Sequence, residues 1–338
     1  MRILFYSTHS YDRREFTLAN ERHGHALAFL EARLGPETAV LARGHDAVCT
    51  FVHDPLDAPT LKLLADAGIR LVILRCAGFN QVDLRAAERL GLAVVRVPAY
   101  SPHAVAEHTA GLILTLNRKF HRAYNRVREN NFLIDGLEGF DLRDKIVGIV
   151  GTGRIGRVFA RIMQGFGCVV RAVDPLRAPG SIRDDIYYTS LPALLADSDI
   201  VSLHCPLTPE SHHLLDEAAL AAMKPGAMLI NTSRGGLLDT EAVIRALKSG
   251  RLGALGLDVY EQEGDLFYED LSSTVVADDV FQRLLTFPNV VITAHQAFFT
   301  HEALAAIAET SLQNADDVAA GKECANRITL AQIAARSS

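Results

Sequence analysis

Three ionisable side chains, Arg234, Glu263 and His295, each follow a short, mostly apolar segment that has the character of a buried strand. An arginine can bind a carboxylate through two parallel hydrogen bonds. A histidine can transfer a proton near neutral pH, and a glutamate can hold that histidine in one tautomer. Brought together, the three would bind an organic acid and move one proton.

Taken singly, each of these residues also has an ordinary explanation. An arginine at a strand end is commonly a surface or salt-bridge residue, Glu261 and Glu263 fit a solvated loop, and His295 is one histidine among 13. His9 and the pair His212-His213 lack the H-E-x-x-H spacing of a metal site. The sequence therefore predicts loop or surface positions for these histidines and no metal-ligand set.

A glycine-rich turn follows the apolar segment 146–150. Gly151, Gly153 and Gly156 have the G-x-G-x-x-G spacing, in which the glycines permit a tight turn, leave room for a pyrophosphate and let the next helix pack closely. The N-terminus of that helix offers unpaired N–H groups to phosphates. Asp174 lies about 18 residues after Gly156, near the spacing expected of a ribose-binding carboxylate. This context favours a dinucleotide site over an ordinary strand-to-helix turn.

An alternation of strands and helices positions these residues. In the first hundred residues we expect strands at 1–7, 37–41, 47–51, 71–74 and 93–97, and helices at 13–34, 58–67 and 82–90. Ser101-Pro102 begins a helix that runs to about residue 130 and could connect two domains. Later strands are expected at 146–150, 168–173, 200–203, 228–231, 254–258 and 290–293, with helices including 191–196, 218–223 and 240–249. The pattern predicts an α/β fold whose parallel strands carry polar groups at their carboxyl ends.

Composition narrows the class of protein. A chain of 338 residues with 49% apolar and 22% charged residues is long enough for two globular domains. The net charge of −6 and the lack of a basic run argue against a nucleic-acid or membrane-surface partner. The apolar run at 1–7 is too short for a signal peptide, and no segment approaches the ~20 apolar residues of a spanning helix. Five scattered cysteines form no disulfide or metal pattern, so we expect a cytoplasmic setting.

Four motifs carry a resemblance to a known family. In chain order they are 151–156 (GTGRIG), 204–208 (HCPLT), 231–235 (NTSRG) and 294–297 (AHQA), and they resemble those of the D-isomer-specific 2-hydroxyacid dehydrogenases over almost the whole chain. Within that family the sequence is most similar to the D-lactate dehydrogenases. Segment 258–270 lacks the Glu-Pro step common in the wider family, and His295 is followed by Gln-Ala-Phe-Phe-Thr instead of a glycine-rich continuation.

The resemblance implies two doubly wound parallel-sheet domains with a cleft between them. A discontinuous, flavodoxin-like substrate domain would contain residues 1–100 and 299–338, and a Rossmann domain that binds NAD would contain residues 101–298. Sequence patterns alone would not return the C-terminal segment to the first domain.

The resemblance also implies roles for individual residues. Arg234 would bind the substrate carboxylate or its carbonyl, His295 would be the acid and base, and Glu263 would pair with His295. The residues implied to bind the cofactor are Gly151, Gly153, Arg154, Ile155, Gly156, Asp174, Cys205, Pro206, Thr232, Ser233 and Asp258. Asp258 would also lie near the catalytic pair. His204 would end a strand beside the cofactor without proton chemistry.

Further residues are implied to contact the substrate, in addition to Arg234 and His295. The loop Cys76-Ala77-Gly78 would offer backbone N–H groups to the carboxylate. Phe51, Tyr100 and Phe299 would narrow the space around the substrate side chain. Phe51 stands where much of the subgroup has a tyrosine, so a hydrogen-bonding role is not carried over.

The reaction that follows from this resemblance is the reversible, NAD-dependent reduction of pyruvate, or a similarly small 2-oxo acid, to the D-2-hydroxy acid. A reductase for hydroxypyruvate, glyoxylate or a bulkier 2-oxo acid is the alternative within the family. A dinucleotide-sensing, corepressor-like binding protein is the alternative of another class, because a fold does not determine a function. A homodimer or homotetramer is expected, although the sequence does not determine the oligomeric state.

Overall fold

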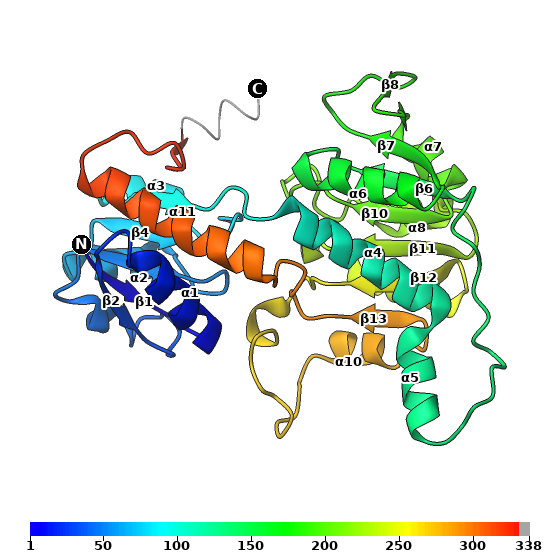
Figure 1. The fold of residues 1–338 in the computed structure, drawn as a ribbon, viewed down its shortest axis with the longest axis horizontal. Helices are drawn as coiled ribbons and strands as arrows, with labels where there is room; N and C mark the ends of the chain where they lie inside the picture. The colour runs from blue at the N-terminus through cyan, green and yellow to red at the C-terminus, as the bar shows by residue number, and fades with distance from the viewer. Residues whose placement is uncertain (331–338) are drawn as a thin grey trace. The chain divides into compact units, whose positions relative to one another are not determined.

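The chain forms two compact units (Figure 1). The structure is a computed structural model that describes residues 1–330, so residues 331–338 of the predicted substrate domain lie outside the described residues. Unit 1 contains Met1–Ser101 and the described part of the segment that begins at Phe299, and unit 2 contains Pro102–Phe298. Each unit has its own sheet and its own apolar core.

Unit 1 contains a five-stranded sheet in the order β2-β1-β3-β4-β5, in which every pair is parallel. The strands are β1 (Arg2–Phe5), β2 (Ala26–Phe29), β3 (Ala47–Thr50), β4 (Leu71–Leu74) and β5 (Ala93–Arg96). This is the flavodoxin-like order, which confirms the expected fold class. β3 and β4 are buried along their whole length, because the sheet is covered on both faces.

Among the described residues of unit 1, four helices cover the sheet. α2 (Ala58–Asp66) and α3 (Leu84–Arg89) share one apolar core with side chains of β1, β3, β4 and β5. The opposite face is covered by α1 (Ser10–Asn20) and α11 (His301–Ala319), and Figure 1 shows α11 lying across this sheet. The side-chain amide of Asn314 donates a hydrogen bond of 2.9 Å to the carbonyl of Arg96 and ties α11 to the end of β5.

Unit 2 contains an eight-stranded sheet in the order β13-β12-β11-β10-β6-β7-β9-β8. The strands are β6 (Ile146–Val150), β7 (Val169–Val173), β8 (Ile182–Arg183), β9 (Ile186–Tyr188), β10 (Ile200–Leu203), β11 (Ala227–Asn231), β12 (Leu252–Leu257) and β13 (Val290–Ile292). All pairs are parallel except β8 with β9. The strand order reverses beside β6, which gives the topological switch point of a Rossmann sheet.

Helices pack on both faces of this sheet as well. α4 (Pro102–Arg118) and α6 (Arg154–Gly165) share a core with one face. The opposite face packs against α7 (Leu191–Asp197), α8 (Glu217–Ala222), α9 (Thr240–Lys248) and α10 (Asp279–Leu285). Short 3₁₀ segments, η2 (Gly235–Leu237) and η3 (Glu263–Asp265), follow β11 and β12. Among the described residues, no helix is both long and apolar enough to cross a membrane.

Three predicted elements are wrong. The helix expected at 13–34 ends at Asn20, whose side chain exchanges two hydrogen bonds with the backbone of His25 and turns the chain into β2. β2 lacks β-branched residues, so its pairing with β1 and not its local preference makes it a strand. The strand expected at 37–41 is instead the 3₁₀ segment η1 (Ala39–Ala42).

The third error is the single helix expected from 102 to about 130. It is divided by Lys119, which has φ +52°, into α4 and α5 (Phe120–Arg128). The small elements β8 and β9, and the helices α10 and α11, were not predicted.

Candidate active site

His295 and Glu263 form a hydrogen-bonded pair in unit 2. The Nδ1 atom of His295 lies 2.7 Å from Oε1 of Glu263, and each side chain is 16% exposed. The other carboxylate oxygen of Glu263 accepts a hydrogen bond of 2.9 Å from the backbone N–H of Tyr260. Within the described residues, Nε2 of His295 has no protein partner and is the nitrogen left to meet a ligand. The pair therefore has the geometry of an oriented acid–base histidine.

The turn after β13 holds His295 in an uncommon backbone conformation. Ala294 and His295 have φ values of +52° and +55°. The N–H of His295 donates to the carbonyl of Asp258 at 2.5 Å, and the hydroxyl of Tyr268 donates to the carbonyl of His295 at 2.6 Å. A left-handed conformation of a residue other than glycine costs of order 1–3 kcal/mol, and such strain clusters at functional sites.

Asp258 is fully buried at the end of β12 and fastens this turn. Its Oδ1 accepts hydrogen bonds from the hydroxyl of Thr293 at 2.6 Å and from the N–H of Gln296 at 2.9 Å, and its Oδ2 accepts one from the N–H of Ala297 at 2.9 Å. Burial lowers the pKa of nearby His108, although Asp258 partly opposes that shift. Asp258 thus positions the histidine turn, and its predicted contact with the nicotinamide stays a prediction.

Arg234 follows β11, the strand next to β12. Its Nη1 donates to the carbonyl of Ser233 at 2.6 Å, and within the described residues the guanidinium has no carboxylate partner. The side chain of Asn231 holds the turn, because it donates to the carbonyl of Arg234 at 2.8 Å and accepts from the N–H of Ser233 at 3.0 Å. Arg234, Glu263 and His295 thus follow three adjacent strands, and the guanidinium is left for an anionic ligand.

The glycine turn has the geometry that a pyrophosphate requires. Gly151 has φ +94°, and a Cβ atom on Gly156 would lie 2.1 Å from the carbonyl oxygen of Gly151. A Cβ on Gly153 would meet nothing within 4 Å, so the side chain missing there leaves open space. Gly153 is also the N-cap of α6, whose first turn carries no acidic residue and no side-chain cap. The N–H groups at this helix end can therefore serve a phosphate.

Asp174 follows β7 and lies beside this turn. Its Oδ2 accepts hydrogen bonds of 2.8 Å from both the N–H and the hydroxyl of Thr152, and its Oδ1 accepts one of 3.0 Å from the N–H of Leu176. Burial opposes ionisation of Asp174, but these hydrogen bonds and the charge of Arg177 outweigh it and hold the pKa below its usual value. A fixed carboxylate next to the phosphate-binding turn fits the ribose of a dinucleotide.

The segment after β10 lies against the glycine turn. The backbone of Cys205 and His204 would contact a Cβ on Gly151 within 3 Å, and the hydroxyl of Ser233 donates to the carbonyl of Cys205 at 2.6 Å. Thr232 is hydrogen-bonded to Thr109 of α4 at 2.9 Å. Burial lowers the pKa of His204 to about 3 and raises that of Cys205 to about 11, so both are neutral at pH 7. Most of the predicted cofactor residues are thus brought together.

In unit 1 the predicted substrate residues follow the carboxyl ends of β3, β4 and β5, except Phe299, which lies just before α11. The loop 76–78 is held because Arg96 donates to the carbonyl of Ala77 at 2.7 Å and Val97 donates to that of Cys76 at 3.2 Å. Phe51 is 5% exposed after β3. Phe299 is 47% exposed, and its ring meets that of Tyr11 edge-on at 4.8 Å. Tyr100 is half-buried after β5.

A buried ionic network beneath this loop was missed in the sequence. Arg75, 2% exposed, lies with Nε 3.2 Å from Oδ1 of Asp12 and donates to the carbonyl of Ser7 at 2.6 Å. Its guanidinium also lies 4.7 Å from the centre of the Phe51 ring. Asp54, also buried, accepts from the hydroxyl of Ser7 at 2.7 Å. A charged residue directly after the apolar run of β4 was the only available signal.

Three comparisons with known proteins point to one family of enzymes. Residues 110–297 match the model of the D-isomer specific 2-hydroxyacid dehydrogenase NAD binding domain. A D-lactate dehydrogenase of Escherichia coli K12 is 50% identical over 328 residues, which are 97% of this chain and 100% of that protein. A pyruvate reductase of Chlamydomonas reinhardtii superimposes with a TM-score of 0.90 at 46% identity, over 96% of this chain and 98% of that one.

A D-lactate dehydrogenase of Lactobacillus jensenii, solved with NAD⁺, is 30% identical, with a TM-score of 0.80 and coverage of 97% of this chain and 100% of that one. The match to the NAD-binding family model includes more than half of the residues, and the similarity to the relatives extends over nearly the full length. The chain therefore belongs to the D-isomer-specific 2-hydroxyacid dehydrogenases, a family of NAD-dependent enzymes.

Proposed function

We propose that this enzyme reduces pyruvate to D-lactate with NADH and catalyses the reverse oxidation. The observation that carries the proposal is the pair of His295 and Glu263, 2.7 Å apart after β13 and β12. Arg234 follows the neighbouring strand β11, and its guanidinium has no carboxylate partner within the described residues. A 2-oxo acid has one carboxylate to bind and one carbonyl oxygen to protonate. The relatives that are D-lactate dehydrogenases and a pyruvate reductase support this choice of substrate.

The chemistry divides among the residues as follows. The guanidinium of Arg234 binds the substrate carboxylate or carbonyl and orients the acid. His295 holds a proton on Nε2 and gives it to the carbonyl oxygen, while Glu263 keeps Nδ1 protonated and stabilises the positive ring. The bound dinucleotide supplies the hydride. In the oxidation of the hydroxy acid, neutral His295 takes the proton back.

The cofactor roles rest on the turn after β6. The open space at Gly153 and the N-terminus of α6, with Arg154 and Ile155, would hold the pyrophosphate, and Asp174 would hold the adenosine ribose. A carboxylate at that position disfavours a 2′-phosphate, so we propose a preference for NAD over NADP.

The substrate roles in unit 1 belong to the loop 76–78 and to Phe51, Tyr100 and Phe299. We propose that the loop N–H groups bind the carboxylate and that the aromatic rings limit the size of the substrate side chain. The edge-on packing of Phe299 on Tyr11 supports a rigid aromatic wall.

We also propose a homodimer or homotetramer in the cytoplasm. Support for association comes from large apolar side chains of α5 and the segment after it, of which Phe132, Leu133 and Ile134 are 71%, 66% and 81% exposed. The five free cysteines fit a reducing compartment. Light scattering of the purified protein measures the oligomeric state directly.

The decisive experiment is NADH oxidation assayed with pyruvate, hydroxypyruvate, glyoxylate and a branched 2-oxo acid. We expect the highest kcat/KM with pyruvate. A tenfold preference for one of the other acids would change the substrate within the family. NADH binding without turnover of any acid would support the corepressor-like alternative.

A further inference from the structure

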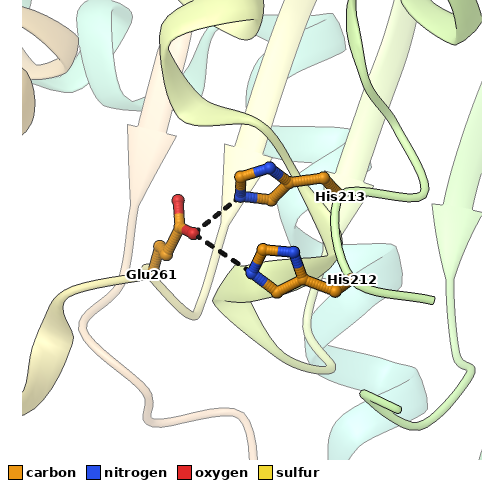
Figure 2. Close-up of side chains that lie close together, drawn as sticks. All are labelled: His212, His213 and Glu261. Atoms are coloured by element: carbon orange, nitrogen blue, oxygen red, sulfur yellow. Dashed lines mark hydrogen bonds and ion pairs between the residues drawn. The ribbon is translucent and has the colours of Figure 1, made fainter. Parts of the chain in front are cut away.

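Two adjacent histidines and one glutamate form a cluster that has no part in the proposed reaction. His212 and His213 lie between β10 and α8, and Glu261 lies between β12 and η3. Figure 2 shows both imidazole rings directed at the glutamate carboxylate. Oε1 of Glu261 lies 2.7 Å from Nε2 of His213 and 3.7 Å from Nε2 of His212. We propose that this His212–His213–Glu261 cluster is a binding site for a divalent transition-metal ion of the Zn²⁺ class.

The spacing of the ligand atoms fits such an ion. Bonds of ~2.0–2.1 Å in a tetrahedral zinc site place neighbouring ligand atoms about 3.3 Å apart. The two measured separations, 2.7 Å and 3.7 Å, lie on either side of this value, and all three ligand atoms are within 4.8 Å of one another. Shifts of about half an ångström would bring both separations from Glu261 to the zinc value.

The backbone prepares the two histidines for a shared ligand. Neighbouring residues of an extended chain direct their side chains to opposite faces. His213 instead has φ +50°, and the two imidazole rings stack at 4.0 Å with an interplanar angle of 24°. The N–H of His213 donates to the carbonyl of Gly236 at 2.8 Å, which fixes the turn.

The donor set selects the chemical class of the ion. Two imidazole nitrogens and one carboxylate oxygen suit Zn²⁺, Co²⁺, Ni²⁺ or Cu²⁺, whereas Mg²⁺ and Ca²⁺ prefer oxygen ligands. The side chains of His212, His213 and Glu261 are 54%, 36% and 28% exposed, so water can occupy the remaining coordination positions. A bound ion would join the 204–216 loop to the 258–263 segment.

Calorimetry tests the proposal on the full-length, chelator-treated protein titrated with ZnCl₂. We expect one Zn²⁺ site per chain. His213→Gln and Glu261→Gln should each lower the affinity for Zn²⁺ by at least ~10- to 100-fold, which is the loss that removal of a supporting partner causes in a metal site. Co²⁺ should give visible absorption bands in the wild type that both variants lose. Mg²⁺ in excess should not displace Zn²⁺.

His103→Gln is the matched control. His103 is an exposed histidine 3.8 Å from Glu107, and in the part of the chain that the structure describes no second histidine joins this pair to form a possible metal site. This variant should bind Zn²⁺ within twofold of the wild type. Binding that survives in Glu261→Gln would place the ion elsewhere, for example on a cysteine, and would overturn the proposal. Absence of Zn²⁺ binding by the wild type would reduce the cluster to a surface ion pair. Neither result depends on which 2-oxo acid the enzyme reduces.

Discussion

The two sheets carry their candidate functional residues at the same kind of edge but support them differently. In unit 2, His295, Glu263 and Arg234 present partly exposed side chains that are held by turns and by the buried carboxylate of Asp258. In unit 1, the loop 76–78 lies beside a charged pair, Arg75 and Asp12, whose side chains are 1% and 5% exposed. Changes in unit 2 should therefore alter catalysis, and changes in unit 1 should first alter stability.

The largest expected effect is the loss of the general acid. His295→Ala should lower kcat by about 10²- to 10⁴-fold, because the variant has no imidazole at this position to donate the proton. NADH binding, followed by fluorescence, should be nearly unchanged, because the ring acts on the substrate. Retention of half the wild-type kcat at neutral pH would remove His295 from the mechanism.

Breaking the buried ion pair of unit 1 should lower the stability of the protein. Arg75→Met should lower the free energy of unfolding by about 3–5 kcal/mol, because it leaves Asp12 buried without its partner. The exposed pair of Arg2 and Asp46, 2.9 Å apart, provides the control, and Asp46→Asn should cost only about 0–1 kcal/mol. Urea unfolding followed by circular dichroism measures both. Equal losses would mean that the buried network is not the main support of this edge.

Replacing Arg234, the proposed anchor of the substrate, by lysine should have an intermediate effect. Arg234→Lys keeps the charge but loses the planar fork that aligns the acid. We expect a higher KM for pyruvate, a lower kcat and a fall in kcat/KM of about 10²-fold. Steady-state assays measure these constants, and a kcat/KM within twofold of the wild type would exclude the proposed fork.

The choice of cofactor tests the proposed role of Asp174, which is hydrogen-bonded to the glycine turn of unit 2. The wild type should have a higher kcat/KM with NADH than with NADPH, and Asp174→Ala should narrow the difference by removing the repelling charge. The charge of Arg177 contributes to lowering the pKa of Asp174, and we expect it to weaken the repulsion of a 2′-phosphate. Equal kcat/KM values for the two cofactors in the wild type would contradict the ribose assignment.

The smallest change, Glu263→Gln, tests the orientation and charge of the pair. In the proposed mechanism the Glu263 carboxylate stabilises the positively charged ring of His295, and glutamine keeps the size of the side chain without its charge. Reduction of the oxo acid needs the imidazolium. As the pH is raised, the reduction rate of the variant should therefore begin to fall at a lower pH than that of the wild type. Oxidation needs the neutral ring, so its activity should extend to lower pH as well.

Profiles of kcat/KM against pH in both directions measure these shifts. Both must move toward acid, since one group controls both. Unmoved profiles would assign the role of Glu263 to another carboxylate, and profiles that move in opposite directions would contradict the single-histidine mechanism.

The amino-acid sequence alone determined the strands and turns whose conformation depends on residues close together in the chain. The strands Leu71–Leu74, Ile146–Val150 and Ile200–Leu203 have the predicted bounds, because continuous apolar runs of these lengths suit a sheet covered on both faces. The glycine turn was predicted from steric rules, and a Cβ on Gly156 would indeed lie 2.1 Å from the carbonyl oxygen of Gly151. Motifs spread along the chain were sufficient to identify the family.

Only the tertiary structure decided the contacts between distant residues. β2 is a strand because β1 pairs with it, and α11 packs on a sheet built almost entirely from the first hundred residues. His213 and Glu261 are 48 residues apart in the chain, so their 2.7 Å contact has no signature in local spacing. Arg75 and Asp12 likewise meet only when β4 and α1 are in place. Local periodicity reports which face of an element is buried, whereas the partner across the fold depends on how whole elements pack.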